Sequence, residues 1–269
     1  MLVRVFVWGC EEELVQPNTA GALKMVKHLP EGHPGTFDNE ERENVHDEIV
    51  RRTLPFLPPT LRAMIILQRL TGCRPSEIFN MRVGEIDRTR ENGLWYYMPR
   101  THKTKKRTGK KIIPLGLPEQ ELIAPYLVGK TSEQAVFSPR TAMAERNAEK
   151  QANRKTKKTP SQVARDAARA AKPPRYREFY NRHSYLQAIE YAIQKANKSL
   201  PDGEKIPHWT PYQLRHSAGT ETSLTAGKDK AKALLGHRST RMTDIYDHSD
   251  LLVREELALK RVNPYDTGE

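Results

Sequence analysis

The stretch of sequence that decides the fold is WTPYQLRH, residues 209–216. Pro211 has a fixed backbone φ and no N–H to lose, so it favours the first position of a helix. We therefore expect a helix from there to about residue 224. Within it, Tyr212 and Arg215 are three residues apart and share one face. The segment thus presents a phenol and a guanidinium on the same side of one helix.

A second short segment, TGCRPSEI at residues 71–78, places another arginine at the start of a helix. An apolar pattern predicts a helix over residues 58–70, which the glycine of this segment ends. Pro75 opens the next helix, through residue 81, and Arg74 stands just before it. Free backbone N–H groups and the positive end of the helix dipole favour an anion at such a position. Arg74 is therefore a candidate anion contact.

Between residues 83 and 115 the pattern changes from helix to strand. Asn92 and Gly93 form a typical hairpin turn, the aromatic segment LWYYM follows it, and KKIIPL is a second apolar run. These signals predict a small antiparallel sheet of three strands. Further helices are expected at residues 118–127, 184–197, 228–235, 240–246 and 251–261. The fold class is therefore α+β, and mainly α.

Positive charge is concentrated in two segments of this 269-residue chain, whose net charge is +12. Residues 100–111 hold seven basic residues and no acid, and residues 140–182 hold thirteen basic and four acidic residues. One such run is often solvated surface, but two in a small protein favour contact with a phosphate backbone. We expect residues 140–182 to be an electrostatic appendage outside the active site. The candidate DNA contacts in the first segment are Arg100, Lys105, Lys106, Arg107, Lys110 and Lys111.

Several classes of protein are excluded by what the sequence does not contain. No apolar run approaches the roughly 20 residues that cross a bilayer, so we expect no membrane partner. Cys10 and Cys73 form neither a CxxC motif nor a disulfide framework. The chain has no GxxxxGK[ST] phosphate loop and no cluster of carboxylates, so we expect no metal and no cofactor. A cytoplasmic protein associated with the nucleoid fits these features.

Five short pieces follow one another in order: RPSE from residue 74, HKT from 102, YQLRHSAGT from 212, LLGHRS from 234, and a tyrosine nine residues after the histidine of LLGH. This ordered set resembles the catalytic domain of tyrosine recombinases, the phage integrase family. The resemblance implies a catalytic domain at residues 46–269 with a small three-stranded antiparallel sheet. It also implies a linker at residues 31–45 and the remnant of an N-terminal helical core-binding domain at residues 1–30. Residues 2–14 fit a strand or a helix by pattern, and the resemblance favours helix.

The resemblance also implies a role for each candidate residue. Arg74 and Arg215 would clamp the non-bridging oxygens of a phosphate, and His237 would add a third donor. Tyr246 would attack the phosphorus to give a 3′-phosphotyrosine, and Lys103 would protonate the departing 5′ oxygen. The implied partner is double-stranded DNA, on which the protein would form a homo-tetramer, with a monomer when free.

One position departs from the pattern of the family, which usually has a histidine three residues before the second arginine. Here that position is Tyr212, which makes it the candidate for the base. A phenol ordinarily has a pKa of about 10 and is a poor general base at neutral pH, so the identity of the base stays open. A site-specific recombinase or integrase is the favoured function. The alternatives are a type IB topoisomerase-like relaxing enzyme and a catalytically impaired DNA-binding remnant of a mobile element.

Overall fold

Helix α4 (Pro59–Thr71) lies at the centre of the larger of two units in this computed structural model. It begins at a proline, whose fixed φ suits the first turn of a helix. It ends at Gly72, whose φ of +62° lies in the left-handed region that glycine adopts without a steric clash. Ten of its residues are buried, so neighbouring elements cover it on nearly every side. The helix expected over residues 58–70 is confirmed.

The structure describes residues 2–27, 29, 33–34, 44–101, 111–172, 176–236 and 248–265. The chain divides into two compact units, Met1–Arg42 and Glu43–Glu269. In the first unit, α1 (Leu2–Glu11) packs against α2 (Pro17–Met25), so the beginning of the chain is helical rather than a strand. The identity of this unit as part of a core-binding domain stays a prediction.

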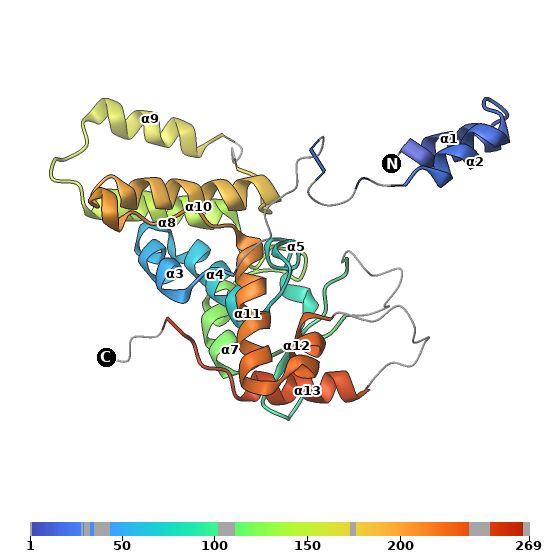
Figure 1. Cartoon of the computed structure of the whole chain (residues 1–269). Helices are drawn as coiled ribbons and strands as arrows, with labels where there is room; N and C mark the ends of the chain where they lie inside the picture. Colours follow the sequence, from blue (N-terminus) through green and yellow to red (C-terminus); the bar gives the residue numbers. More distant parts are fainter. Residues whose placement is uncertain are drawn as a thin grey trace. The chain divides into compact units, whose positions relative to one another are not determined.

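The larger unit is mostly helical (Figure 1). Besides α4, its helices are α3 (Asp47–Thr53), α5 (Pro75–Phe79), α7 (Leu117–Ile123), α8 (Pro139–Ala152), α9 (Pro160–Ala170), α10 (Arg182–Asn197), α11 (Pro211–Ala226), α12 (Lys228–Leu235) and α13 (His248–Leu259). Short 3₁₀ turns lie at Leu54–Phe56, Val83–Glu85, Ala124–Tyr126 and Asp202–Glu204. The helices expected in the second half of the chain are confirmed to within a few residues, except that the one at 240–246 lies outside the described residues.

The sheet has the three antiparallel strands that the sequence predicts, and the α+β, mainly α fold class is confirmed. In the order β1 (Ile86–Asp87), β2 (Trp95–Tyr97) and β3 (Ile113–Leu115), each strand pairs with the next. Tyr97 stands opposite Ile86 on one side and Ile113 on the other. The connection from β2 to β3 contains the first basic segment, of which residues 102–110 lie outside the described part of the chain.

The start of α11 is fixed by hydrogen bonds that reach the middle of α4 and the end of α3. The Gln68 side chain donates from Nε2 to the carbonyl oxygen of Pro211 at 2.6 Å and accepts from the hydroxyl of Tyr185 at 3.1 Å. The indole N–H of Trp209 donates to the Thr53 hydroxyl at 3.1 Å. The four side chains in these bonds, those of Gln68, Tyr185, Trp209 and Thr53, are all buried. Buried hydrogen bonds of this kind fix the position of α11 relative to α4.

Part of the second basic segment packs against the core, which corrects the expectation that all of it is an appendage. Ala142 of α8 is buried, and the Glu145 carboxylate accepts hydrogen bonds from the backbone N–H and the hydroxyl of Thr60 at 2.9 and 2.8 Å. Tyr180, near the end of the segment, is also buried. The appendage is therefore confined to the stretch between these anchors.

Gly116, between β3 and α7, offers a direct test of how closely α13 is packed. A Cβ at this position would lie 2.0 Å from the carbonyl oxygen of Ala258 in α13, and this oxygen belongs to the backbone. We expect Gly116→Ala to lower the free energy of unfolding by about 1–3 kcal/mol, the usual cost of overpacking. Chemical denaturation measures the loss.

The matched control for this prediction is Gly203→Ala, because a Cβ on Gly203 meets nothing within 4 Å. This variant should stay within about 0.5 kcal/mol of the wild type. Equal stability of the Gly116 variant and this control would contradict the close approach of α13.

Candidate active site

Arg215 occupies the point where three helices meet. It lies on α11, is 3% exposed, and donates from Nη1 to the Gly72 carbonyl at 2.7 Å and from Nη2 to the Leu235 carbonyl at 2.5 Å. These carbonyls belong to the C-terminal ends of α4 and α12, which both end at a left-handed glycine, the second being Gly236. Since the C-terminal end of a helix carries partial negative charge, both ends favour the guanidinium. Arg215 therefore joins α11 to α4 and α12.

Arg74 comes two residues after the carbonyl that Arg215 binds, and Glu77 fixes its position. The Glu77 carboxylate is fully buried and lies 3.2 Å from Nη1 of Arg74 through its Oε1 atom. Its Oε2 atom accepts the backbone N–H of Arg74 at 2.8 Å and the Lys111 ammonium at 2.7 Å. One buried carboxylate thus orients two cations at the end of α4.

The pKa shifts show that these charges act on one another. Burial raises the pKa of Glu77, but the charges of Lys111 and Arg74 outweigh it and hold the pKa below its ordinary value. Burial lowers the pKa of Arg215, and the charge of Arg74 lowers it further. Two guanidinium groups close enough to repel each other are typical of a site that receives an anion.

Tyr212 lies on the first turn of α11, one turn before Arg215. Its side chain is on the surface at 36% exposed, and its ring centroid lies 5.3 Å from that of His216 with a 55° angle between the ring planes. The phenol is therefore accessible and next to an imidazole. The sequence spacing predicted the shared helix, but not this contact between the two rings.

Helix α13 begins two residues after Tyr246 and is fastened to the elements around it. Arg254 donates from Nε to the Ala233 carbonyl of α12 at 2.8 Å and from Nη1 to the Ile112 carbonyl next to β3 at 3.2 Å. The Tyr96 hydroxyl of β2 donates to Glu255 at 2.8 Å. Sequence reasoning missed Arg254, because a single arginine on a helix has no distinguishing signal.

The remaining candidate residues are one exposed arginine, one largely buried lysine and seven residues that the structure does not describe. Arg100 is exposed and forms an ion pair with Glu133 at 2.5 Å. Lys111 differs from the expected surface contact, since its side chain is only 10% exposed and its ammonium pairs with Glu77 inside the site. The candidates Lys103, Lys105, Lys106, Arg107, Lys110, His237 and Tyr246 lie outside the described residues.

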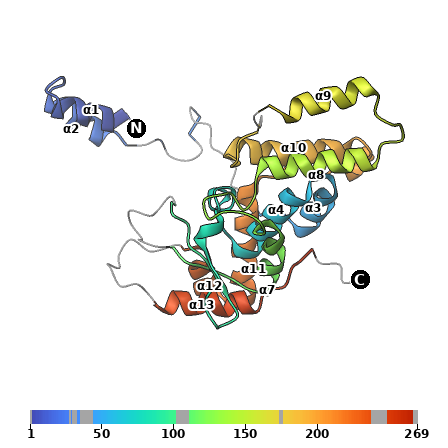
Figure 2. The same ribbon diagram turned by 180° about the vertical axis from the view of Figure 1, so that it is seen from behind.

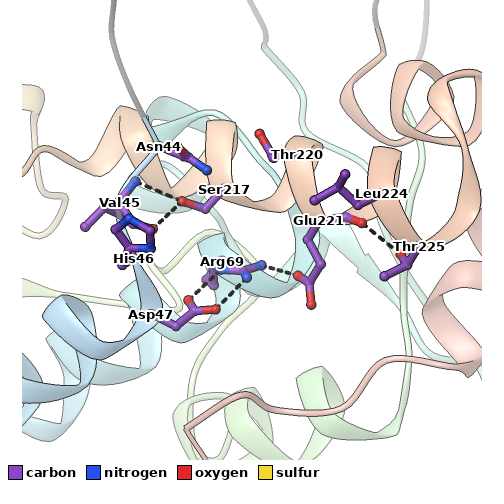
Figure 3. Close-up of a pocket in the computed structure, with 10 residues that line it drawn as sticks. All are labelled: Asn44, Val45, His46, Asp47, Arg69, Ser217, Thr220, Glu221, Leu224 and Thr225. Carbon is purple, nitrogen blue, oxygen red and sulfur yellow. Dashed lines mark hydrogen bonds and ion pairs between the residues drawn. The ribbon is translucent and has the colours of Figure 1, made fainter.

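A separate cavity of about 260 Å³ lies where the start of the larger unit meets α11 (Figure 3). The buried guanidinium of Arg69 binds both carboxylate oxygens of Asp47, at 2.8 and 2.7 Å, and an oxygen of Glu221 at 2.7 Å. Burial by itself lowers the pKa of Arg69, but these carboxylates raise it above its ordinary value. Because these charges pair with one another, the cluster joins α3 and α4 to α11. It is not a candidate for catalysis.

The described residues contain no group of three or more His, Cys, Asp or Glu side chains that could hold a metal ion. Among the helices that the structure describes, none is long and apolar enough to span a membrane. Cys73, beside Arg74, is a free buried thiol, and burial raises its pKa.

The sequence profile of the phage integrase family matches residues 43–251, which is more than half of the chain. The chain belongs to the phage integrase family. The resemblance found in the sequence motifs is thereby confirmed. Family membership supports a general role in site-specific DNA recombination, as a DNA strand-transferase.

One solved structure similar to this integrase-family protein shares its fold at low sequence identity, and a second gives a weaker match. Lambda integrase residues 75–356, a dimer bound to a COC′ core site, align with a TM-score of 0.51 and 14% identity over 94% of this chain and 70% of that chain. The XerH site-specific recombinase bound to difH substrate aligns with a TM-score of 0.40 and 16% identity over 74% of this chain. The alignment covers 48% of the XerH chain, about half its length. No curated protein gives a significant sequence match.

The shared carboxylate of Glu77 leads to a prediction about stability. Glu77→Gln should lower the free energy of unfolding by about 3–5 kcal/mol at neutral pH, because it leaves the buried Lys111 ammonium uncompensated. The double variant Glu77→Gln/Lys111→Met should recover most of this loss, since it also removes the buried positive charge of Lys111. Chemical denaturation of the wild type, both single variants and the double variant gives the coupling.

The pH dependence supplies the control for this prediction. The pKa of Glu77 is lower in the folded protein than its ordinary value of 4.5. Its contribution to the free energy of unfolding is therefore present above about pH 4.5 and is lost as the pH falls through the pKa of the folded state. The difference between wild type and Glu77→Gln should therefore shrink in acid. Additive losses in the double variant would show that Glu77 and Lys111 do not depend on each other.

Proposed function

We propose that this integrase-family protein is a site-specific recombinase that breaks and rejoins DNA through a 3′-phosphotyrosine intermediate. The observation that carries the proposal is the pair of arginines, Arg74 and Arg215, held close together by Glu77 and by the ends of α4 and α12. Guanidinium groups stay charged and bind phosphate oxygens in pairs of hydrogen bonds. Such fixed donors stabilise a phosphorane that gains negative charge, and one donor is commonly worth about 10²–10³ in rate.

In the proposed reaction, the phenolic oxygen of Tyr246 attacks the phosphorus and the bond from phosphorus to the 5′ oxygen breaks. Lys103 protonates the departing 5′ oxygen, and the phenolic proton leaves to a base in the region of Tyr212. His237 adds a donor to the phosphate. The 5′-hydroxyl of another strand then attacks the phosphotyrosine, which rejoins the DNA and restores the phenol. The bond energy is conserved throughout.

The elements next to the proposed catalytic residues support their assignment to one site. His237 directly follows Gly236 at the end of α12, and Tyr246 precedes α13 by two residues. Arg254 of α13 binds carbonyls of α12 and of the segment that enters β3. The connection that contains Lys103 ends at this segment.

The proposed partner is double-stranded DNA, on which the protein assembles as a homo-tetramer from free monomers. The similar lambda integrase chain is a dimer on a core site, which supports assembly on DNA. The basic segment at residues 100–111 supplies charge for the phosphate backbone. Such a protein acts in the cytoplasm, on nucleoid DNA.

The nucleophile is tested with Tyr246→Phe, which removes one hydroxyl and leaves the basic surface unchanged. With nicked duplexes of randomised sequence as the probe, we expect the wild type to form covalent protein–DNA adducts on a denaturing gel and the variant to form none. Non-covalent binding to duplex DNA should stay within about twofold, because no phosphate contact is lost.

Tyr191→Phe is the matched control, since Tyr191 is an exposed tyrosine of α10 whose loss should leave adduct formation unchanged. An adduct that persists in Tyr246→Phe would move the nucleophile to another residue. Absence of any wild-type adduct from the whole library would argue against the proposed function.

The identity of the base is tested with Tyr212→His, which places the usual residue of the family at this position. We expect the variant to cleave at least as fast as the wild type at neutral pH, because imidazole ordinarily titrates near pH 6.5. Its cleavage rate should then fall as the pH drops below about 6.5, where the imidazole becomes protonated. Tyr212→Phe, which offers no proton acceptor, should be slower than both. Severe loss of cleavage in a folded Tyr212→His variant would show that the site is built around the phenol.

A further inference from the structure

Residues 150–172 form a basic arm that consists of the end of α8, the following loop, α9 and two residues beyond it. The arm contains eight basic residues and one acidic residue, a net charge of +7. All the basic side chains are exposed except that of Lys158, which is half-buried. This is the densest positive charge among the described residues, and the proposed catalytic steps make no use of it.

The arm has a fixed base and an ordered interior. At its base, α8 is held to α4 by the bonds between Glu145 and Thr60. Both views show α9 on the far side of α8 and α10 from α4 (Figures 1 and 2). Within the arm, Arg154 donates to the Gln162 side chain at 2.7 Å, and Lys158 pairs with Asp166 at 2.8 Å. These contacts connect the loop to α9, and no side chain of α9 that the structure describes is buried.

Three cations of the arm are presented to solvent. Arg165 and Arg169 are one turn apart on the same side of α9, and Lys172 follows just beyond its end. All three are exposed, and they form no hydrogen bond or ion pair with any residue that the structure describes. The single acid of the arm, Asp166, is already engaged by Lys158. The three charges are therefore available to a polyanion.

We propose that the basic arm binds the phosphate backbone of duplex DNA outside the stretch held by the active site. The charge of the arm complements that of the backbone, and contacts to phosphates position a protein without reading sequence. Residues 139–172 contain no aromatic side chain, whereas single-strand binding uses aromatic rings on which bases stack. The proposal shares DNA as the partner with the proposed function but does not depend on the chemistry of Tyr246.

The test is the triple variant Arg165→Gln/Arg169→Gln/Lys172→Gln, whose glutamines keep the helix propensity of α9. Affinity for a duplex of about 40 base pairs and arbitrary sequence is measured between about 50 and 200 mM salt. Each phosphate contact contributes about −0.9 to the slope of log K against log salt, so we expect the slope to flatten by up to about 2.7.

The matched control removes the same charge elsewhere, in Lys195→Gln/Lys198→Gln/Lys205→Gln, from exposed lysines at the end of α10 and in the loop beyond it. Its slope should change by less than half as much. An unchanged slope in the arm variant, or equal flattening in the control, would overturn the proposal and leave an acidic protein as the partner to test.

Adduct formation at saturating DNA separates this proposal from the proposed function. The arm variant should form Tyr246 adducts at the wild-type level, because the arm adds affinity and takes no part in cleavage. A flattened slope without adducts in any variant would keep the arm and reject the chemistry. Normal adducts with an unchanged slope would keep the proposed chemistry and reject DNA binding by the arm.

Discussion

The buried guanidinium of Arg215 is the interaction on which the rest of the structure depends. A charge in the interior of a protein is tolerated only when fixed polar groups compensate it, and here the ends of α4 and α12 do so. The same two helix ends lead directly into Arg74 and His237. The residue proposed to bind phosphate is therefore also the residue that aligns the segments around it, so a change at Arg215 affects folding and phosphate binding together.

Glu77 has the complementary role of holding positive charge together in the absence of substrate. Without this carboxylate, Arg74 and Lys111 would be two partly buried cations in the neighbourhood of a third. With it, the repulsion is reduced but the cluster keeps an excess of positive charge. Such a cluster stays folded and still favours an anion, which is the balance that a phosphate site requires.

The sequence predicted most of the fold, because prolines and glycines mark helix boundaries through local backbone geometry. It also predicted that Arg74 lies at a helix start suited to an anion and that Arg215 shares a helix face with Tyr212. It did not predict that Lys111 is buried, since a run of basic residues does not show which one faces the core. Nor did it predict that α8 packs on α4, because this contact depends on Ala142 and Glu145 meeting a distant helix. Such long-range pairings have no local signal.

The anchoring of the basic arm at both ends limits what it can do mechanically. A charged tail with one free end samples a wide volume and has no preferred distance from the rest of the protein. This arm leaves the domain through α8 and returns through α10, which lie side by side in both views (Figures 1 and 2). Within it, α9 has 11 residues and spans about 16 Å at 1.5 Å per residue. A segment attached at both ends explores less volume than such a tail, so the charges of the arm stay near α8 and α10.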